Sequence, residues 1–158
     1  MGNLFAGSEI VELGVQIEKN GRDFYSALFE QSRSSKAKEV FKFLAGEEEK
    51  HITAFQKILE KVVLYEPAES YPGEYFAYMN DLAADYVFTR KDKGKEIAKN
   101  IKSDKEAVDV GIKFEKDSII FYDGMKKVVL ENEHKIINEL LEQEKTHLVK
   151  LSELKKQI

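Results

Sequence analysis

Residues 45–55 read AGEEEKHITAF and residues 141–151 read LEQEKTHLVKL, and each stretch places a Glu three residues before a His. The two pairs, Glu48/His51 and Glu144/His147, recur 96 positions apart. Residues three apart lie on the same face of an α-helix, so each stretch presents a carboxylate and an imidazole together. The sequence therefore predicts two helices that each carry a pair of metal-ligand side chains.

The repeat extends beyond these two stretches. Residues 14–25 read GVQIEKNGRDFY and residues 111–122 read GIKFEKDSIIFY, so that Gly, Glu-Lys and Phe-Tyr recur 97 positions apart. Each copy contains one further Glu, Glu18 or Glu115. The chain is thus interpreted as two related helical hairpins, over about 8–62 and 103–158.

Apolar residues at alternating spacings of three and four predict two helices in each hairpin. We expect them over about Ser8–Gln31 and Lys36–Val62, then over Ser103–Leu130 and from Asn132 to the C-terminus. Ser35 is the predicted N-cap of the second helix.

The connection over 63–102 is too long for a hairpin turn. Tyr71-Pro72-Gly73 predicts a turn, and helices are expected over Glu74–Phe88 and around Lys95–Ile101. A connection of this length predicts a crossover that makes the second and third helices parallel. The expected fold is an all-α four-helix bundle, with residues 1–158 as one domain.

The composition excludes several classes of site. The 158 residues include no cysteine, which excludes disulfides, thiolate zinc sites, iron–sulfur clusters and cysteine nucleophiles. The net charge of −4, without a dense Lys/Arg run, predicts neither nucleic-acid nor membrane binding. Without a signal-peptide pattern or a long apolar segment, the expected location is cytoplasmic.

Four Glu and two His fall among the apolar seam positions of the predicted helices, and their distances from the two turns place them in one layer. Four buried carboxylates are costly unless cations balance them, and two divalent cations supply four positive charges. Carboxylate and imidazole ligands suit iron or manganese, and zinc is a common substitute. The pattern also matches the dimetal-carboxylate arrangement of helical bundles. The predicted metal ligands are Glu18, Glu48, His51, Glu115, Glu144 and His147.

Other residues near this layer have two interpretations each. Glu131/His134 is a third Glu-x-x-His pair, but it lies about 15 Å along the helix from the layer, so we assign it no metal. Tyr25 and Tyr122 follow Glu18 and Glu115 by seven residues. They are either aromatic residues of the core or functional side chains of the site. The repeated glycines, Gly14 and Gly111, indicate either room for a ligand or close helix packing.

These motifs resemble the rubrerythrin branch of the ferritin-like di-iron carboxylate superfamily, over nearly the whole chain. The resemblance implies a ferritin-like bundle in which Glu48 and Glu144 bridge two irons. Glu18 and Glu115 would then be terminal ligands, and each His would bind one iron. It also implies that Tyr25 and Tyr122 hydrogen-bond ligand carboxylates or pass electrons.

Two features depart from typical rubrerythrins. The family commonly carries a rubredoxin domain with four cysteines, which this sequence lacks. It also commonly has another Glu three residues after the third-helix ligand, where this chain has Ser118. The six-ligand set resembles ferroxidase centres and stand-alone rubrerythrin-like proteins.

The resemblance implies an oxidoreductase that reduces hydrogen peroxide or dioxygen with two irons. Its electrons would come from an external donor protein such as rubredoxin, and the chain would form a homodimer or a higher homo-oligomer. The alternative is a ferroxidase or iron-storage protein of the ferritin type. A module in which the metal only fixes the fold, or a hydroxylase component, also stays open at this point.

Overall fold

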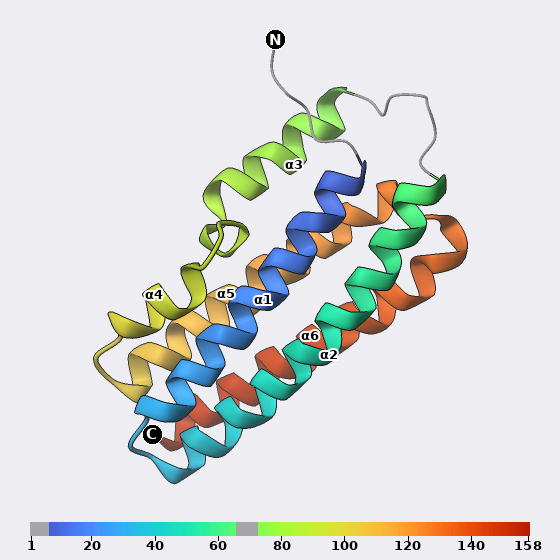
Figure 1. Ribbon diagram of the computed structural model, residues 1–158. Coiled ribbons are helices and arrows are strands. Elements are labelled where there is room, and N and C mark those ends of the chain that lie inside the picture. Colours follow the sequence, from blue (N-terminus) through green and yellow to red (C-terminus); the bar gives the residue numbers. More distant parts are fainter. Residues whose placement is uncertain (1–6, 66–72) are drawn as a thin grey trace.

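The computed structural model of the protein describes residues 7–65 and 73–158, and every regular element within these ranges is helical. Four long helices form the bundle seen in Figure 1: α1 (Gly7–Gln31), α2 (Ser35–Tyr65), α5 (Asp104–Met125) and α6 (His134–Gln157). The all-α class and the bundle predicted from the sequence are confirmed.

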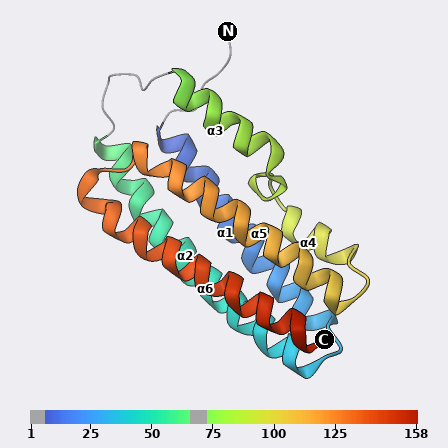
Figure 2. The ribbon, with the colours of Figure 1, turned by 180° about the vertical axis from the view of Figure 1, so that it is seen from behind.

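The crossover runs along the side of the bundle. It contains α3 (Gly73–Asp85), the 3₁₀ turn η1 (Val87–Thr89) and α4 (Lys93–Lys99). Because it returns the chain to the end where α2 began, α2 and α5 point the same way (Figure 1). Seen from behind, α6 ends beside the turn between α1 and α2 (Figure 2). The turn predicted at Tyr71-Pro72 lies outside the described residues.

The helices form because their apolar residues lie on one stripe each, which the bundle buries. The fully buried side chains with the largest volumes come from α1, α2, α5 and α3: Tyr25, Tyr122, Phe24, Phe41, Phe55, Phe121, Ile10, Ile17, Leu28, Leu44, Ile58 and Met79. The stripe is interrupted at mid-height, where buried Glu and His take core positions. This interruption marks the candidate site.

Several predicted helix ends are displaced in the structure. Ser34, not Ser35, caps α2, because its hydroxyl accepts a hydrogen bond from Ala37 N at 3.3 Å. The third helix ends at Met125 and not near Leu130, and the 3₁₀ turns η2 (Lys126–Val128) and η3 (Glu131–Glu133) precede α6.

His134 accounts for the turn between α5 and α6. Its Nε2 donates toward the carbonyl oxygens of Lys126 and Val129, at 2.8 and 3.0 Å. These carbonyls lie just past the end of α5, and the Lys126 carbonyl also accepts from Val129 N at 3.2 Å, so His134 joins two carbonyls of the same turn. The third Glu-x-x-His pair thus has a structural role in the turn.

Asn20 attaches the crossover to the bundle. Its side chain is fully buried in α1 and donates to the carbonyls of Phe88 and Arg90, each at 2.6 Å. Its Oδ1 accepts from the backbone N–H groups of Lys93 and Gly94, at 3.0 and 3.1 Å, which begin α4. One side chain therefore satisfies four backbone groups of the crossover.

Asn20→Ala is expected to lower the free energy of unfolding by about 3 kcal/mol, because it leaves buried backbone groups without partners. Urea unfolding followed by circular dichroism measures the change. Asn138→Ala, at an exposed position of α6, is the matched control and should differ little from wild type. Equal losses in the two variants would contradict the role given to Asn20.

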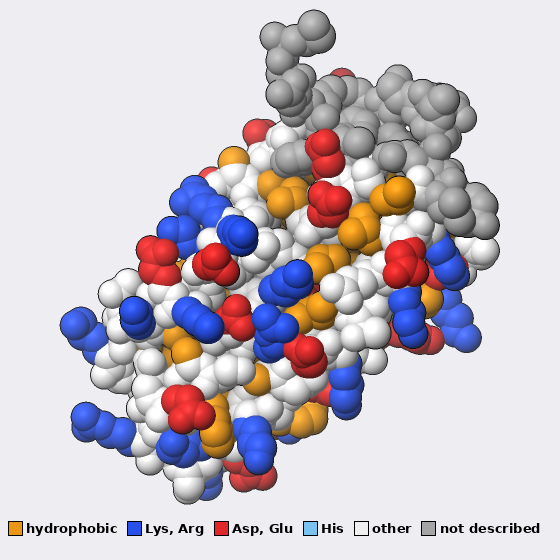
Figure 3. Space-filling model, in the orientation of Figure 1, with side chains coloured by type: hydrophobic (Ala, Val, Ile, Leu, Met, Phe, Trp, Pro, Cys, Tyr) orange, Lys and Arg blue, Asp and Glu red, His pale blue; other side chains and the backbone are white. Residues whose placement is uncertain are grey.

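The described surface shows Lys and Arg side chains interspersed with Asp and Glu over the face in Figure 3. Apolar side chains lie between them. None of the helices in the described ranges combines the length and the apolar character needed to span a bilayer.

Candidate metal centre

The structure brings all six predicted ligands into one buried layer. Each of the four long helices contributes: α1 and α5 one Glu each, and α2 and α6 a Glu and a His each. None of these side chains is more than 2% exposed: Glu18, Glu48, His51, Glu115, Glu144 and His147. The equal spacing of the ligands from the two turns is the reason that they meet.

The six side chains form two overlapping groups. Glu18 and His51 approach Glu48 and Glu144 on one side, and Glu115 and His147 approach the same two carboxylates on the other. Within each group the potential ligand atoms lie within 4.8 Å of one another. Glu48 and Glu144 are therefore shared, as expected of carboxylates that bridge two metal ions.

Unsatisfied polar atoms support metal binding at this layer. Among the described residues, nine buried side-chain nitrogen or oxygen atoms have no hydrogen-bond partner, and all nine belong to these six residues. Buried polar atoms without partners are rare in native proteins, and a metal ion that binds them is one established explanation. His51 Nδ1 lies 2.7 Å from Glu144 Oε1 without the alignment of a hydrogen bond. The donor set fits a dimetal carboxylate centre.

The two tyrosines lie at the centre and act crosswise between the hairpins. Tyr25 of α1 donates to Glu115 Oε1 of α5 at 2.7 Å, and Tyr122 of α5 donates to Glu18 Oε1 of α1 at 2.6 Å. In both carboxylates the other oxygen, Oε2, is one of the unsatisfied atoms. Each tyrosine therefore occupies one oxygen of a terminal carboxylate and leaves the other for a cation.

Gln143 is a site residue that the sequence did not reveal. Its Oε1 lies 2.6 Å from His51 Nε2, so that ring nitrogen donates and Nδ1 faces the carboxylates. A metal-binding His needs this arrangement, with one nitrogen protonated and held and the other directed at the cation. Nothing in the spacing distinguishes Gln143 from other polar residues of α6.

In the metal-free protein, the shared and terminal carboxyl groups strongly shift one another's pKa values. Burial, followed by the charge of Glu144, raises the pKa values of Glu48 and Glu115 well above the ordinary value. Burial alone would also raise the pKa of Glu144, but the close approach of the Glu115 carboxyl group and of the His51 ring outweighs it and lowers that pKa. Of the two shared carboxyl groups, Glu144 thus favours the ionised form and Glu48 the protonated form.

The pKa values of the two imidazoles are also shifted in opposite directions. Burial by itself would lower the pKa of His51, but the carboxylates of Glu18 and Glu144 raise it to about 11. Burial lowers the pKa of His147, and the charge of His51, whose ring stacks on it at 5.5 Å, works in the same direction. Without metal, protons on Glu48, Glu115 and His51 provide part of the balance that cations would provide.

Small residues shape the layer beside the ligands. A side chain at Gly21 would meet Phe114 and lie 3.3 Å from Glu48 Oε2, so this glycine allows the Phe114 ring to pack beside a shared carboxylate. The neighbours of Gly14 are Met125 and Phe55, and Gly111 lies against Leu151 and the Tyr25 hydroxyl. Of the two interpretations of the repeated glycines, close packing is the one that these contacts favour.

Ser118 occupies the position where typical rubrerythrins carry another Glu. Its hydroxyl contacts Tyr86 of the crossover at 2.7 Å and donates to Phe114 O at 2.9 Å. Tyr86 is buried, and its hydroxyl also donates to Phe114 O. The sequence predicted Tyr86 only as part of a helix, because its approach depends on the path of the crossover.

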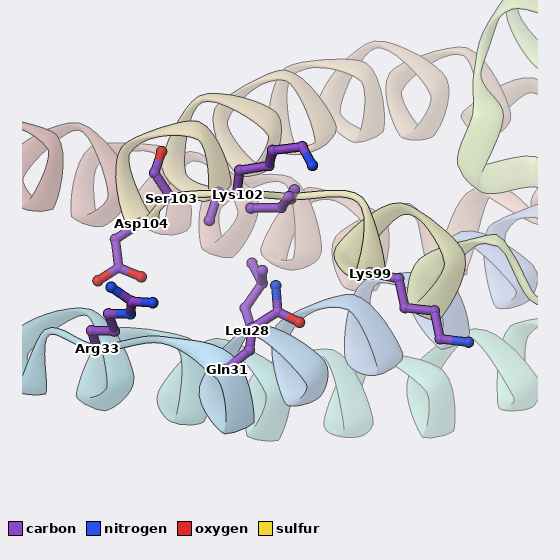
Figure 4. A pocket seen from close by; sticks show the side chains of 9 residues that line it. Leu28, Gln31, Arg33, Lys99, Lys102, Ser103 and Asp104 are labelled. Carbon is purple, nitrogen blue, oxygen red and sulfur yellow. The ribbon is translucent and has the colours of Figure 1, made fainter.

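A cavity of about 430 Å³ lies away from this layer, between the end of α1 and the start of α5 (Figure 4). Arg33 and Asp104 lie toward one another at its edge, and Lys99 and Lys102 extend from the crossover. Asp104 accepts hydrogen bonds from Ser32 Oγ and Ser34 N. The metal ligands do not line this cavity.

Comparisons with known proteins agree with the geometry. No curated protein matches the sequence. A crystal structure from Thermotoga maritima, described as a candidate ferritin-like diiron-carboxylate protein, is similar with a TM-score of 0.68 and 26% identity. The match covers 99% of this chain and 98% of the other. The family described as Rubrerythrin matches residues 9–155. With its ferritin-like bundle and its buried layer of four Glu and two His, the chain belongs to the rubrerythrin family.

Proposed function

We propose that the protein is an oxidoreductase that reduces hydrogen peroxide, or dioxygen, at two iron ions held by the six ligands. The observation that carries the proposal is the pair of ligand groups sharing Glu48 and Glu144, with one terminal carboxylate and one His on each side. Two ferrous ions supply two electrons, which is the number that reduction of one peroxide to two waters requires. Manganese and zinc fit the same donor types, but zinc has no redox chemistry.

The protein's own residues prepare the centre for a small oxidant. Tyr25 and Tyr122 hold one oxygen of each terminal carboxylate, which favours binding through the other oxygen alone. Terminal carboxylates that bind through one atom leave coordination positions open. Burial raises the pKa values of both tyrosine hydroxyls, so they stay protonated and keep donating to these carboxylates, and the two protons that peroxide reduction consumes come from solvent. We therefore propose that Tyr25 and Tyr122 act in catalysis by orienting the terminal carboxylates.

The electrons are proposed to come from a separate donor protein such as rubredoxin, because the chain has no cysteine to hold such a centre itself. A possible entry point supports this. Phe43 is 43% exposed, and its ring centroid lies 6.3 Å from that of His147. Lys150 lies over the same ring, 4.7 Å from its centroid. A donor that docks at Phe43 would thus be one side chain away from a proposed ligand.

Peroxide consumption by the iron-loaded protein tests the function. Without a donor, we expect one peroxide to be consumed for every two ferrous ions, after which the reaction stops. Reduced rubredoxin should restore turnover. Failure to consume peroxide or dioxygen would contradict the proposal. Storage of hundreds of ferric ions in a 24-subunit particle, found by light scattering, would favour the ferritin-type alternative.

Tyr122→Phe is expected to keep two metal ions while slowing peroxide consumption by about 10- to 100-fold, a typical effect of removing the hydrogen-bond partner of a metal ligand. The variant also leaves Glu18 Oε1 without its hydrogen bond. Stopped-flow measurement of the ferrous protein with peroxide gives the rate. Tyr78→Phe, at a residue that is 49% exposed, is the control. Unchanged rates in Tyr122→Phe would exclude a catalytic role for this hydroxyl.

A further inference from the structure

The two metal positions have the same ligand types but different neighbours behind their His rings. Glu47 and Gln143 immediately precede the two shared carboxylates, and they are equivalent in the repeat. Gln143 Oε1 lies 2.6 Å from His51 Nε2, whereas Glu47 Oε1 lies 4.0 Å from His147 Nε2. An amide therefore faces one imidazole and a carboxylate faces the other.

His147 Nε2 lacks a hydrogen-bond partner although its side chain is only 1% exposed. Its Nδ1 faces Glu48, Glu115 and Glu144 at 3.4 to 3.9 Å, so this nitrogen is the one directed at a cation. When Nδ1 binds a cation, Nε2 must carry the proton, and a buried N–H needs an acceptor.

Glu47 is placed to be that acceptor. Its Oε1 needs to approach His147 Nε2 by about 1 Å to reach hydrogen-bond distance. The side chain is 19% exposed and thus lies at the edge of the core. Its other oxygen, Oε2, is 3.0 Å from Lys50 Nζ, which leaves Oε1 available.

We propose that Glu47 is a positioning residue that makes the two metal positions unequal. The position formed by Glu115 and His147 then binds the first divalent cation, and the position formed by Glu18 and His51 binds the second. A carboxylate acceptor makes an imidazole a stronger ligand and adds negative charge nearby, whereas an amide acceptor only orients the ring. The inference depends on the metal centre and is independent of the reaction that the centre performs.

Metal-free protein and Co²⁺, which binds without oxidising, provide the test. With one equivalent of Co²⁺, crystals should show anomalous density mainly at the Glu115/His147 position. Calorimetric titration should resolve two affinities that differ by about tenfold or more, the usual effect of such a hydrogen-bond partner. Glu47→Gln should reduce the stronger affinity to near the weaker one.

The exchange variant Glu47→Gln/Gln143→Glu should reverse the order, so that the first Co²⁺ occupies the Glu18/His51 position. Both substitutions keep helix propensity and side-chain length nearly constant, so folding should be unaffected. Glu49→Gln is the matched control. It removes a charge two residues further along α2, at a side chain that is 60% exposed and pairs with Arg22. It should leave the order and both affinities unchanged.

Equal occupancy of the two positions at one equivalent, or an order that the exchange variant leaves unchanged, would overturn the inference. Binding of fewer than two equivalents by wild-type protein would overturn the metal centre itself. The two failures are thus distinguishable.

Discussion

Glu144→Ala should bind less than one equivalent of iron, whereas Glu18→Ala should retain about one. Glu144 belongs to both ligand groups, and Glu18 belongs to one. Loss of even an outer hydrogen-bond partner costs about 10- to 100-fold in metal affinity, so loss of a shared ligand should cost more at both positions. Elemental analysis of protein loaded anaerobically with ferrous ion measures the content.

The control for this result is Glu142→Ala, two residues earlier on α6, where the side chain is 73% exposed and pairs with Lys145. It makes the same change in helix composition but should bind two equivalents. Circular dichroism of the metal-free variants confirms that each has folded. Two equivalents bound by Glu144→Ala would show that this carboxylate does not hold the metal ions together.

The stability of the metal-free protein should fall as pH rises, and that of the metal-loaded protein should fall as pH is lowered. Without metal, the folded state retains protons on Glu48 and Glu115 above pH 4.5, where the unfolded chain releases them. His51 acts in the same direction between pH 6.5 and about 11. Because the folded state then binds more protons, its stability decreases with increasing pH.

Metal binding reverses the dependence. The cations require deprotonated carboxylates and an imidazole with a free nitrogen, so lowering the pH returns protons to the ligands and releases the metal. Urea midpoints at pH 5.5, 7 and 8.5, with chelator or with saturating Co²⁺, measure the two trends. In Glu48→Gln/Glu115→Gln, which cannot ionise at these positions, the metal-free trend should be weaker. Parallel trends with and without metal would contradict the assignment of these protons.

The sequence was informative about the centre because the ligands break a regular pattern. An apolar residue is expected at positions 48 and 144, and the charged residues there, repeated at fixed spacing, predict the layer. Helix rise then fixes the heights, so the meeting of four helices could be derived without coordinates. The resemblance predicted the sharing of Glu48 and Glu144, and the two ligand groups have that arrangement.

The remaining features depend on three-dimensional contacts that periodicity does not encode. Gln143 and Tyr86 approach the layer because of the orientation of α6 about its axis and the path of the crossover. Neither residue belongs to a sequence pattern that indicates a site. The crosswise tyrosine contacts were also hidden, since each tyrosine follows one Glu in sequence but donates to the Glu of the other hairpin. Helix ends were displaced by hydrogen bonds from single side chains such as Ser34 and His134.

The crosswise contacts have a consequence for how such a chain can arise and assemble. Neither hairpin alone contains a complete metal centre. Each tyrosine donates to a carboxylate of the other hairpin, and each ligand group takes residues from both hairpins. A single ancestral hairpin could therefore have built the same centre by pairing with an identical copy, and gene duplication would then have joined the two. During folding of the present chain, metal binding would therefore begin only when the two hairpins pack together, and not when either hairpin forms.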